Sequence, residues 1–411
     1  WLECLLVKDI KRDFYGKVVI RKMKKVTILI PGMYYGGMER VAFITRQILL
    51  KNNYNVSFVT LFDNDADYQP NFEYLSLKCD IKPSKFGKVI NIFKRVYKMK
   101  SVKKKLKTDI TISFGQSCNL VNVLSKRDDK VYVGIRSYDW LFQYIFHYYV
   151  DKFVYKKADA VVSVSQLIKR DAENIFNFNK DKSYFLYNPY DLELINNKSK
   201  EKITEIEVPT DKKIIVTVGR LEDQKGLYHL IKAISMLKNK DNVVVYILGH
   251  GTKKELLENL IKAYQLQNVI FLLGGQSNPY KYMSRADLYV MPSITEGFPN
   301  ALVEAMSTET AVLCADCKSG PREILSNRTL DTICENIEYA ESGILVCPMT
   351  DSRNYSPQYE ECDKNLANAI EELIENDNLR NKYAKAAKKR AELYSYDAFE
   401  HNLLQIMKTF N

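Results

Sequence analysis

The sequence predicts an α/β fold of two doubly wound parallel-sheet domains that face each other across a cleft. Three observations lead to this prediction. The chain of 411 residues is longer than one ordinary domain. Short runs rich in Val and Ile alternate with helical patterns, and this alternation occurs twice, on either side of a polar stretch. Strands that alternate with helices indicate parallel sheets with helices on both faces. Such sheets bind ligands beyond the carboxyl ends of their strands, so chemistry is expected at the turns from strand to helix.

The first half contains six candidate strands that are nearly continuous in apolar character, as buried parallel strands are. Residues 23–195 therefore form the expected N-terminal domain. Residues 1–22 lack a signal-peptide pattern because charges interrupt the apolar residues, and we interpret them as an extension outside the core fold. The candidate strands span residues 26–30, 56–61, 109–113, 131–135, 160–164 and 183–186, with a helical pattern over 38–51.

The second half repeats the pattern after a polar linker over residues 196–212. Residues 213–390 form the expected C-terminal domain, and residues 391–411 form a helix that could cross back to the N-terminal domain. The candidate strands span residues 214–218, 243–248, 269–272, 288–291, 311–314 and 344–346.

Composition and charge narrow the class of protein. The net charge of +11 favours an anionic partner such as a nucleotide or an acidic membrane face, although biased Lys usage alone would also produce it. Eight dispersed cysteines indicate a reduced, cytoplasmic protein. Only Cys314 and Cys317 are close in sequence, and they lack the second pair or the nearby histidines of a zinc site. No apolar run reaches the roughly 18 residues of a membrane-spanning helix, and no nucleic-acid-binding module is recognised.

Two turns place glycines or cations at strand ends. The turn after the first strand contains Gly36 and Gly37 and opens a helix. Adjacent glycines let backbone N–H groups approach an anion at a helix N-terminus, although a simple tight turn would look the same. The turn after the first strand of the second half contains Gly219, Arg220 and Lys225. Its two cations could hold a diphosphate, and the alternative is a pair of solvated surface charges.

A third turn, after residues 288–291, is the most informative. It reads Glu-Gly-Phe-Pro-Asn-Ala-Leu-Val-Glu from Glu296 to Glu304. Pro299 suits the first position of a helix, and the unpaired N–H groups of a helix start can bind a phosphate. The two carboxylates could flank that phosphate and accept hydrogen bonds from sugar hydroxyls. The alternative is a capping acid followed by an ordinary helix glutamate.

This string resembles the Glu-x7-Glu signature of the large retaining glycosyltransferase family 4, which has the GT-B fold of two Rossmann-like domains. The variant present here looks most like bacterial capsule and O-antigen enzymes. The resemblance covers about residues 24–395 and is stronger in the second half. Further matches are Gly36-Gly37, Gly219-Arg220, Lys225-Gly226 and the segments 248–251, 284–287 and 316–324.

The resemblance implies roles for these residues. Arg220 and Lys225 would bind the donor diphosphate and stabilise the leaving group. Glu296 would contact the transferred sugar as the third catalytic residue, and Glu304 would hold the ribose hydroxyls. The other implied donor-binding residues are Gly36, Gly37, Gly219, Gly249, Gly274, Gly275, Gly297, Phe298, Pro299, Asn300, Ala301 and Leu302.

No metal and no cofactor are expected, because fixed cations can neutralise a departing diphosphate. Residues 63–67 have the Asp-x-Asp spacing of metal-binding transferases of another fold, but they precede every donor motif, and we interpret them as solvated surface. One position departs from the family pattern. Many relatives carry a histidine near the reaction centre in the N-terminal domain, where this chain has Arg136 and Ser137. Arg136 could face the donor phosphate or the acceptor.

Residues 85–107 hold ten Lys or Arg and no acid, and their apolar residues fall on one helical face. A basic amphipathic helix of this kind can lie on an anionic membrane surface. The alternative is that the apolar face packs on the N-terminal sheet and only the lysines meet water. The apolar residues are Phe86, Val89, Ile90, Phe93, Val96, Tyr97 and Leu106.

Together these features predict a hexosyltransferase at the inner face of the plasma membrane. It would move a hexose or N-acetylhexosamine from a nucleotide sugar, expected to be UDP-linked, to a growing, lipid-linked surface polysaccharide. Two alternatives stay open. One is a catalytically silent binding protein of the same fold, against which the intact donor residues argue. The other is a Rossmann oxidoreductase, for which Gly249-His-Gly251 is the nearest dinucleotide string but lacks the third glycine.

Overall fold

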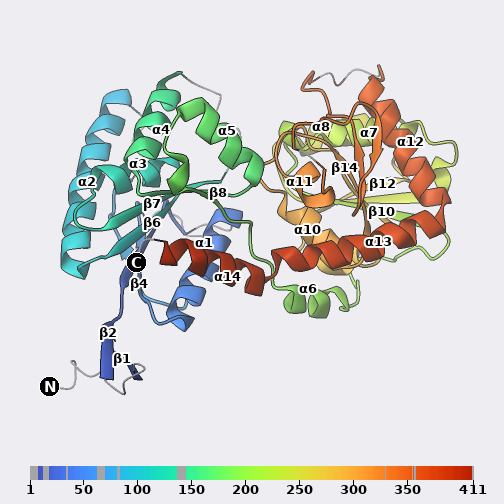
Figure 1. The fold of residues 1–411 in the computed structure, drawn as a ribbon. Helices are drawn as coiled ribbons and strands as arrows, with labels where there is room; N and C mark the ends of the chain where they lie inside the picture. Colours follow the sequence, from blue (N-terminus) through green and yellow to red (C-terminus); the bar gives the residue numbers. More distant parts are fainter. Residues whose placement is uncertain are drawn as a thin grey trace.

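The computed structural model contains two seven-stranded sheets, one in each half of the chain, which lie side by side with helices around them (Figure 1). This arrangement confirms the predicted fold class. The structure describes residues 8–12, 18–33, 36–62, 70–80, 84–136, 145–328, 330–353, 355 and 358–409.

The N-terminal sheet has the order β5-β4-β3-β6-β7-β8-β9, and all of its neighbours pair in parallel. Its strands are β3 (Lys25–Ile30), β4 (Asn55–Thr60), β5 (Leu75–Ser76), β6 (Ile110–Phe114), β7 (Lys130–Ile135), β8 (Ala160–Ser163) and β9 (Ser183–Phe185). The helices of this domain are α1 (Gly37–Lys51), α2 (Lys85–Leu106), α3 (Gln116–Leu124), α4 (Ile145–Lys157) and α5 (Gln166–Phe176).

The C-terminal sheet has the order β12-β11-β10-β13-β14-β16-β15, and only the edge strand β15 is antiparallel to its neighbour. Its strands are β10 (Lys213–Val218), β11 (Val243–Leu248), β12 (Ile270–Gly274), β13 (Leu288–Met291), β14 (Ala311–Ala315), β15 (Ile337–Tyr339) and β16 (Ile344–Val346). The helices of this half are α6 (Leu192–Ser199), α7 (Leu227–Ser235), α8 (Lys254–Ala263), α9 (Tyr280–Met283), α10 (Asn300–Ser307), α11 (Pro321–Leu325), α12 (Glu361–Glu375) and α13 (Asp377–Ala391). A last helix, α14 (Tyr396–Lys408), packs on the N-terminal domain instead.

In each sheet, the strand that comes first in the chain lies in the interior, and later strands are added on both sides of it. The strand β3 lies between β4 and β6, and β10 lies between β11 and β13. The carboxyl ends of these strands are topological switch points, where doubly wound sheets bind ligands. The extension before β3 forms a separate hairpin, because β1 (Lys8–Arg12) and β2 (Val18–Lys22) pair only with each other (Figure 1).

The end of the chain returns to the N-terminal domain. Helix α13 lies on the C-terminal domain, and α14 continues from it to lie beside α1 (Figure 1). Leu403 and Met407 of α14 are buried in the same apolar core as Ile28 of β3. The predicted linker begins inside α6 and then contacts the C-terminal domain, where Glu205 pairs with Lys281 at 2.6 Å.

Helix α2 docks on its own domain through a polar stripe. Asn91, Arg95 and Lys103 are buried and lie at spacings of four and eight residues, which put them on one side of the helix. Asn91 Nδ2 donates to Asp80 O at 2.7 Å, and Arg95 Nη2 donates to Cys79 O at 2.8 Å. These bonds pair Asn91 Nδ2 and Arg95 Nη2, while Arg95 Nε is buried without a hydrogen-bond partner among the described residues. Met99 of the same helix is fully buried and adds an apolar contact to this interface.

Four residues of the predicted apolar face of α2 point the other way, while Val96 and Leu106 are half-buried. Val89, Ile90, Phe93 and Tyr97 are 51%, 52%, 71% and 77% exposed. The interpretation that this face packs on the sheet is therefore wrong for these four residues, while the side chain of Phe86 lies outside the described residues. Among the described residues, no helix combines the length and the apolar character that crossing a bilayer requires.

Candidate active site

Lys225 and Glu296 follow two neighbouring strands of the C-terminal sheet. Lys225 lies in the turn after β10 and Glu296 in the turn after β13, and these strands pair in parallel. Because the carboxyl ends of both strands meet at one edge of the sheet, the side chains come together, with Lys225 Nζ 2.6 Å from Glu296 Oε1. Ser293 Oγ donates to the same oxygen at 2.7 Å. Arg220 lies exposed in the turn that carries Lys225.

Three glycine turns adjoin this pair. Gly249 has a φ of +151°, and a Cβ there would lie 1.8 Å from the carbonyl oxygen of Gly219, so only glycine fits this approach. The amide of Gly275, next to Gly274, donates to His250 Nε2 at 2.9 Å. The structure therefore holds the turns after β10, β11 and β12 against one another, with four of the predicted donor glycines in them.

The helix that follows Glu296 begins one residue later than predicted. Pro299 is the N-cap in an extended conformation, and α10 begins at Asn300. Ala301 is half-buried and Leu302 buried in its first turn. Gly297, just before the cap, offers its carbonyl oxygen to Ser319 Oγ at 2.6 Å. The predicted string therefore forms a turn that leads directly into a helix N-terminus.

Asn300 connects this turn to the N-terminal domain. Its Oδ1 accepts hydrogen bonds from Asn188 Nδ2 at 2.7 Å and from Tyr190 OH at 2.6 Å. A Cβ on Gly37 would lie 2.7 Å from Asn300 Nδ2, so the N-termini of α1 and α10 approach each other closely. Both helix starts favour an anion there. Glu39, in the first turn of α1, is a buried carboxylate whose pKa is raised by that burial.

Glu304 forms an ion pair across the interdomain boundary. Arg40 Nη1, from the second turn of α1, lies 2.8 Å from Glu304 Oε1, and Tyr280 OH lies 3.5 Å from the same oxygen. Burial acts to lower the pKa of Arg40, but Glu304, Tyr280 and Tyr190 together outweigh this and raise it. Sequence reasoning missed Arg40, although it stands four residues after Gly36.

Arg136 reaches the same region from the carboxyl end of β7. Its Nη2 donates to Asn188 Oδ1, and Asn188 in turn donates to Asn300. Burial lowers the pKa of Arg136 to about 10. The side chain therefore lies two hydrogen bonds from the start of α10, on the N-terminal side of the boundary. Ser137, the other predicted acceptor-side residue, lies outside the described residues.

Two family models match the chain in succession. The Glycosyltransferase Family 4 model matches residues 35–194, and the Glycosyl transferases group 1 model matches residues 198–341. An uncharacterised glycosyltransferase of Methanocaldococcus jannaschii is 30% identical over an alignment of length 318 that covers 71% of this chain and 78% of the relative. The chain belongs to glycosyltransferase family 4.

Other similar proteins span nearly the whole glycosyltransferase. The Campylobacter jejuni N-acetylgalactosamine-N,N'-diacetylbacillosaminyl-diphospho-undecaprenol 4-alpha-N-acetylgalactosaminyltransferase is 29% identical over 90% of this chain and 96% of its own. A solved Rickettsia africae glycosyltransferase covers 94% of this chain and 98% of its own at 17% identity and a TM-score of 0.73. Anabaena HepE in complex with UDP covers 94% and 100% at 17% identity and a TM-score of 0.68. At such identities the structures confirm the GT-B fold alone.

Family membership confirms the predicted enzyme class and disfavours the oxidoreductase alternative. Close packing explains why the Gly249-His-Gly251 string has glycine at both of its ends. A Cβ on Gly251 would lie 2.3 Å from the carbonyl oxygen of Leu221. Close approach between two turns therefore accounts for this string without a dinucleotide.

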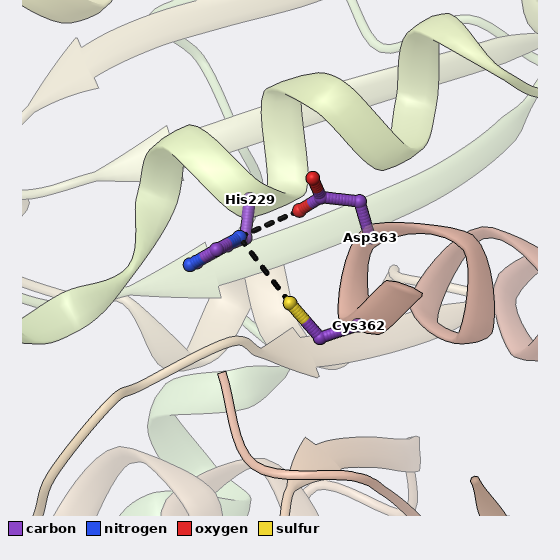
Figure 2. A group of neighbouring side chains, drawn as sticks. All are labelled: His229, Cys362 and Asp363. Carbon is purple, nitrogen blue, oxygen red and sulfur yellow. Dashed lines mark hydrogen bonds and ion pairs between the residues drawn. The ribbon is translucent and has the colours of Figure 1, made fainter. Parts of the chain in front are cut away.

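One group of side chains in the glycosyltransferase has the composition of a metal site. His229, Cys362 and Asp363 lie together between α7 and α12 (Figure 2). His229 Nδ1 lies 2.6 Å from Asp363 Oδ1, and His229 Nε2 lies 3.0 Å from Thr350 O. Lys232 Nζ is 3.9 Å from the other Asp363 oxygen. Both ring nitrogens are hydrogen-bonded and a second cation is adjacent, so the group fits a buried ion pair better than a cation site. Residues 63–67, with the Asp-x-Asp spacing, lie outside the described residues.

Proposed function

We propose that this glycosyltransferase moves a hexose or N-acetylhexosamine from a UDP-sugar to a lipid-linked precursor of a surface polysaccharide, with retention of anomeric configuration and without a metal. The observation that carries the proposal is the cluster at the carboxyl edge of the C-terminal sheet. Lys225 and Glu296 are in contact there, Arg220 lies in the same turn, and the start of α10 follows.

The chemistry of this cluster suits a departing nucleoside diphosphate. Negative charge develops on the leaving diphosphate in the transition state, and fixed cations with helix N–H groups stabilise it without reorganisation. In the proposal, Arg220 and Lys225 bind the diphosphate, Glu296 contacts the transferred sugar, and Glu304 holds the ribose. The acceptor would then attack from the same face of the sugar that the diphosphate leaves.

The names of similar proteins support the choice of substrates. The Campylobacter relative is named for a diphospho-undecaprenol acceptor, and the Anabaena structure contains UDP. Relatives over shorter parts of the chain are named for teichuronic acid and colanic acid biosynthesis. We therefore propose a UDP-linked donor and an acceptor on a lipid carrier, at the cytoplasmic face of a membrane.

The test is a thermal-shift screen against UDP-, GDP-, ADP- and dTDP-sugars, followed by transfer assays with and without EDTA. We expect UDP-sugars to raise the melting temperature of the wild type and of Lys213→Ala, but not of Lys225→Ala. Lys213 is a matched control, because it begins the strand that Lys225 follows and pairs with Asp377 at 3.1 Å. Glu296→Ala should keep UDP binding and lose transfer. If no nucleotide sugar stabilises the wild type, the silent-protein alternative replaces the proposal.

We propose further that α2 places the enzyme on an anionic bilayer. Its exposed apolar residues are surrounded by lysines, and residues 84–107 contain no acid. Lys and Arg near an anionic surface add about 1 kcal/mol each. A second copy of the protein is a poorer partner for α2, because a two-fold contact would place the lysines of one α2 against those of the other. The helix lies on the side of its domain away from the C-terminal domain (Figure 1), so docking leaves the interdomain boundary accessible.

Sedimentation with lipid vesicles tests this placement. Vesicles that contain phosphatidylglycerol should bind the wild type, and pure phosphatidylcholine or high salt should weaken binding. The change of Phe93→Ser with Tyr97→Ser should reduce binding at least tenfold. Ile333→Ser is the matched control, because Ile333 is 64% exposed on the C-terminal domain. Equal binding by both variants, or binding indifferent to lipid charge, would exclude α2 as the docking surface.

A further inference from the structure

The segment that the sequence singled out at residues 316–324 contacts the other domain. Glu323, on α11 of the C-terminal domain, is only 5% exposed. Its Oε1 accepts from the backbone N of Gln166 at 2.6 Å, and its Oε2 accepts from the backbone N of Leu167 at 3.2 Å. Tyr187 OH donates to Oε1 at 2.6 Å. A carboxylate of one domain therefore caps helix α5 of the other.

This cap completes the first turn of α5. The first N–H groups of a helix have no partner within the helix. The N-cap of α5, Ser165, accepts only from Ile168 N, at 3.2 Å. Glu323 accepts hydrogen bonds from the N–H groups of the two residues between them, Gln166 and Leu167. These two N–H groups have a protein partner only while the two domains are in contact. Separation of the domains would expose both N–H groups and the Glu323 carboxylate to water. Burial raises the pKa of Glu323, against the hydrogen bonds that lower it.

A second link connects the same helix start to the predicted donor turn. Ser319 Oγ donates to the carbonyl oxygen of Gly297 at 2.6 Å and lies 3.0 Å from Ser165 Oγ. Because the Ser319 proton is used on Gly297, Ser165 is the donor of the bond between the two hydroxyls. One chain of hydrogen bonds therefore runs from α5, across the domain boundary, to the residue next to Glu296.

The backbone of this segment is held in an uncommon conformation. Ser319 has a φ of +66°, which residues other than glycine rarely adopt. At the next residue, Gly320, φ is +100° and a Cβ would lie 2.3 Å from Pro299 Cδ. Such conformations cost about 1 kcal/mol or more and persist where surrounding packing imposes them. Here they bring the segment against the donor turn.

We propose that Glu323 and Ser319 are positioning residues for sugar transfer. Glu323 holds the two domains in the arrangement seen here, and Ser319 makes the geometry of the donor turn depend on that arrangement. Neither residue needs to touch a substrate. The inference rests on the proposed function for its kinetic readout, but its structural readout is independent of any substrate.

The test uses Glu323→Gln, whose amide N–H group would face the N–H donors of α5. Small-angle scattering of the substrate-free protein should show a larger radius of gyration than the wild type. The dissociation constant for the donor nucleotide should stay within about twofold, while kcat falls on the order of tenfold, as expected for loss of a hydrogen-bonded charge. Glu341→Gln is the matched control, because Glu341 accepts from Asn327 N at 2.9 Å within one domain.

Ser319→Gly separates the two halves of the proposal. Glycine suits the φ of this position, so the change removes the hydroxyl without adding strain. We expect kcat to fall severalfold while scattering and the melting temperature stay unchanged. The proposal is overturned if Glu323→Gln leaves both scattering and kcat at the wild-type values, or if it weakens nucleotide binding as much as it lowers kcat. Altered scattering in a protein that transfers no sugar would uphold the domain contact and refute the proposed function instead.

Discussion

At the scale of single residues, the predicted donor groups already have partners in this structure. Lys225 is paired with Glu296, and Arg40 with Glu304. Each carboxylate is about nine-tenths buried, where an unpaired charge would be costly, and its paired cation compensates that charge. A donor that enters would meet groups whose orientation is already fixed. Arg40 contacts one oxygen of Glu304, and in the proposed function the other oxygen would accept a ribose hydroxyl.

We expect Arg40→Ala to weaken donor binding about tenfold, because a hydrogen bond between charged groups contributes roughly 1.5–3 kcal/mol. Nucleotide titration by calorimetry measures the change. Arg46→Ala is the control, since Arg46 is on the same helix but lies over the Phe72 ring, 3.9 Å from its centroid, within the N-terminal domain. Tighter nucleotide binding by Arg40→Ala would show that Arg40 competes with the ribose rather than orienting Glu304.

Contacts within one sheet followed from the sequence, and contacts between domains did not. The approach of Lys225 to Glu296 is expected because both follow strands of one parallel sheet. Arg40 and Glu304 are 264 positions apart and belong to different domains, and no spacing in the chain relates them. The same holds for Asn300 and Tyr190. The glycine at position 37 was the one local signal, because it marks a close approach.

At the scale of elements, a buried ion pair joins α7 to α12. The imidazole of His229 and the carboxylate of Asp363 are fully buried. Burial acts to lower the pKa of His229, but the hydrogen bonds to Asp363, Cys362 and the Thr350 carbonyl together outweigh this and raise it to about 9. Lys232 of α7, with Cys362 and Glu360 at the start of α12, also faces this pair.

The raised pKa predicts a loss of stability in mild alkali. An unfolded histidine titrates near 6.5, so the folded state binds the extra proton between about pH 6.5 and pH 9. The contribution is complete below pH 6.5 and is lost as the pH rises towards 9, by about 3 kcal/mol at most. Urea unfolding across this range measures it. His229→Gln should abolish the slope; a slope that persists in the variant would assign it to another group.

Strand positions were predictable, and the orientation of one helix was not. Buried parallel strands such as β11 and β14 are continuous apolar runs, which the sequence shows directly. Within the two main sheets, the strands that were missed, β5 and β15, are short edge strands with polar residues. The hairpin strands β1 and β2 were also missed, in the extension before β3. For α2, periodicity identified the apolar face, but it does not say which face meets the domain. There Arg95 and Lys103 find carbonyl and carboxylate partners, and Met99 is fully buried in an apolar cluster. Polar and apolar contacts of that face therefore fix the orientation together.

At the scale of the whole molecule, the chain crosses the domain boundary twice, at α6 and after α13. The second crossing matters for stability, because α14 covers the N-terminal sheet with side chains of the last residues. Leu403 is 5% exposed there and packs in the core that contains Val41 of α1. The N-terminal domain is therefore complete only when the end of the chain is in place.

Because only the N-terminal domain depends on α14, a change in this helix should destabilise that domain and leave the C-terminal domain unchanged. Leu403→Ala should lower the free energy of unfolding of the N-terminal domain by about 2–5 kcal/mol, the usual cost of a cavity left by a buried leucine. Gln405→Ala, on the exposed side of the same helix, should change it by less than about 0.5 kcal/mol. Urea unfolding followed by hydrogen exchange of β3 and β10 reports each sheet. Loss of protection in β3 with β10 unchanged is expected, because β3 packs under α14 and β10 does not. Equal loss in both sheets would mean that the domains unfold as one unit, and the N-terminal core would then owe its stability to the domain contacts at Glu323 and Asn300 as much as to α14.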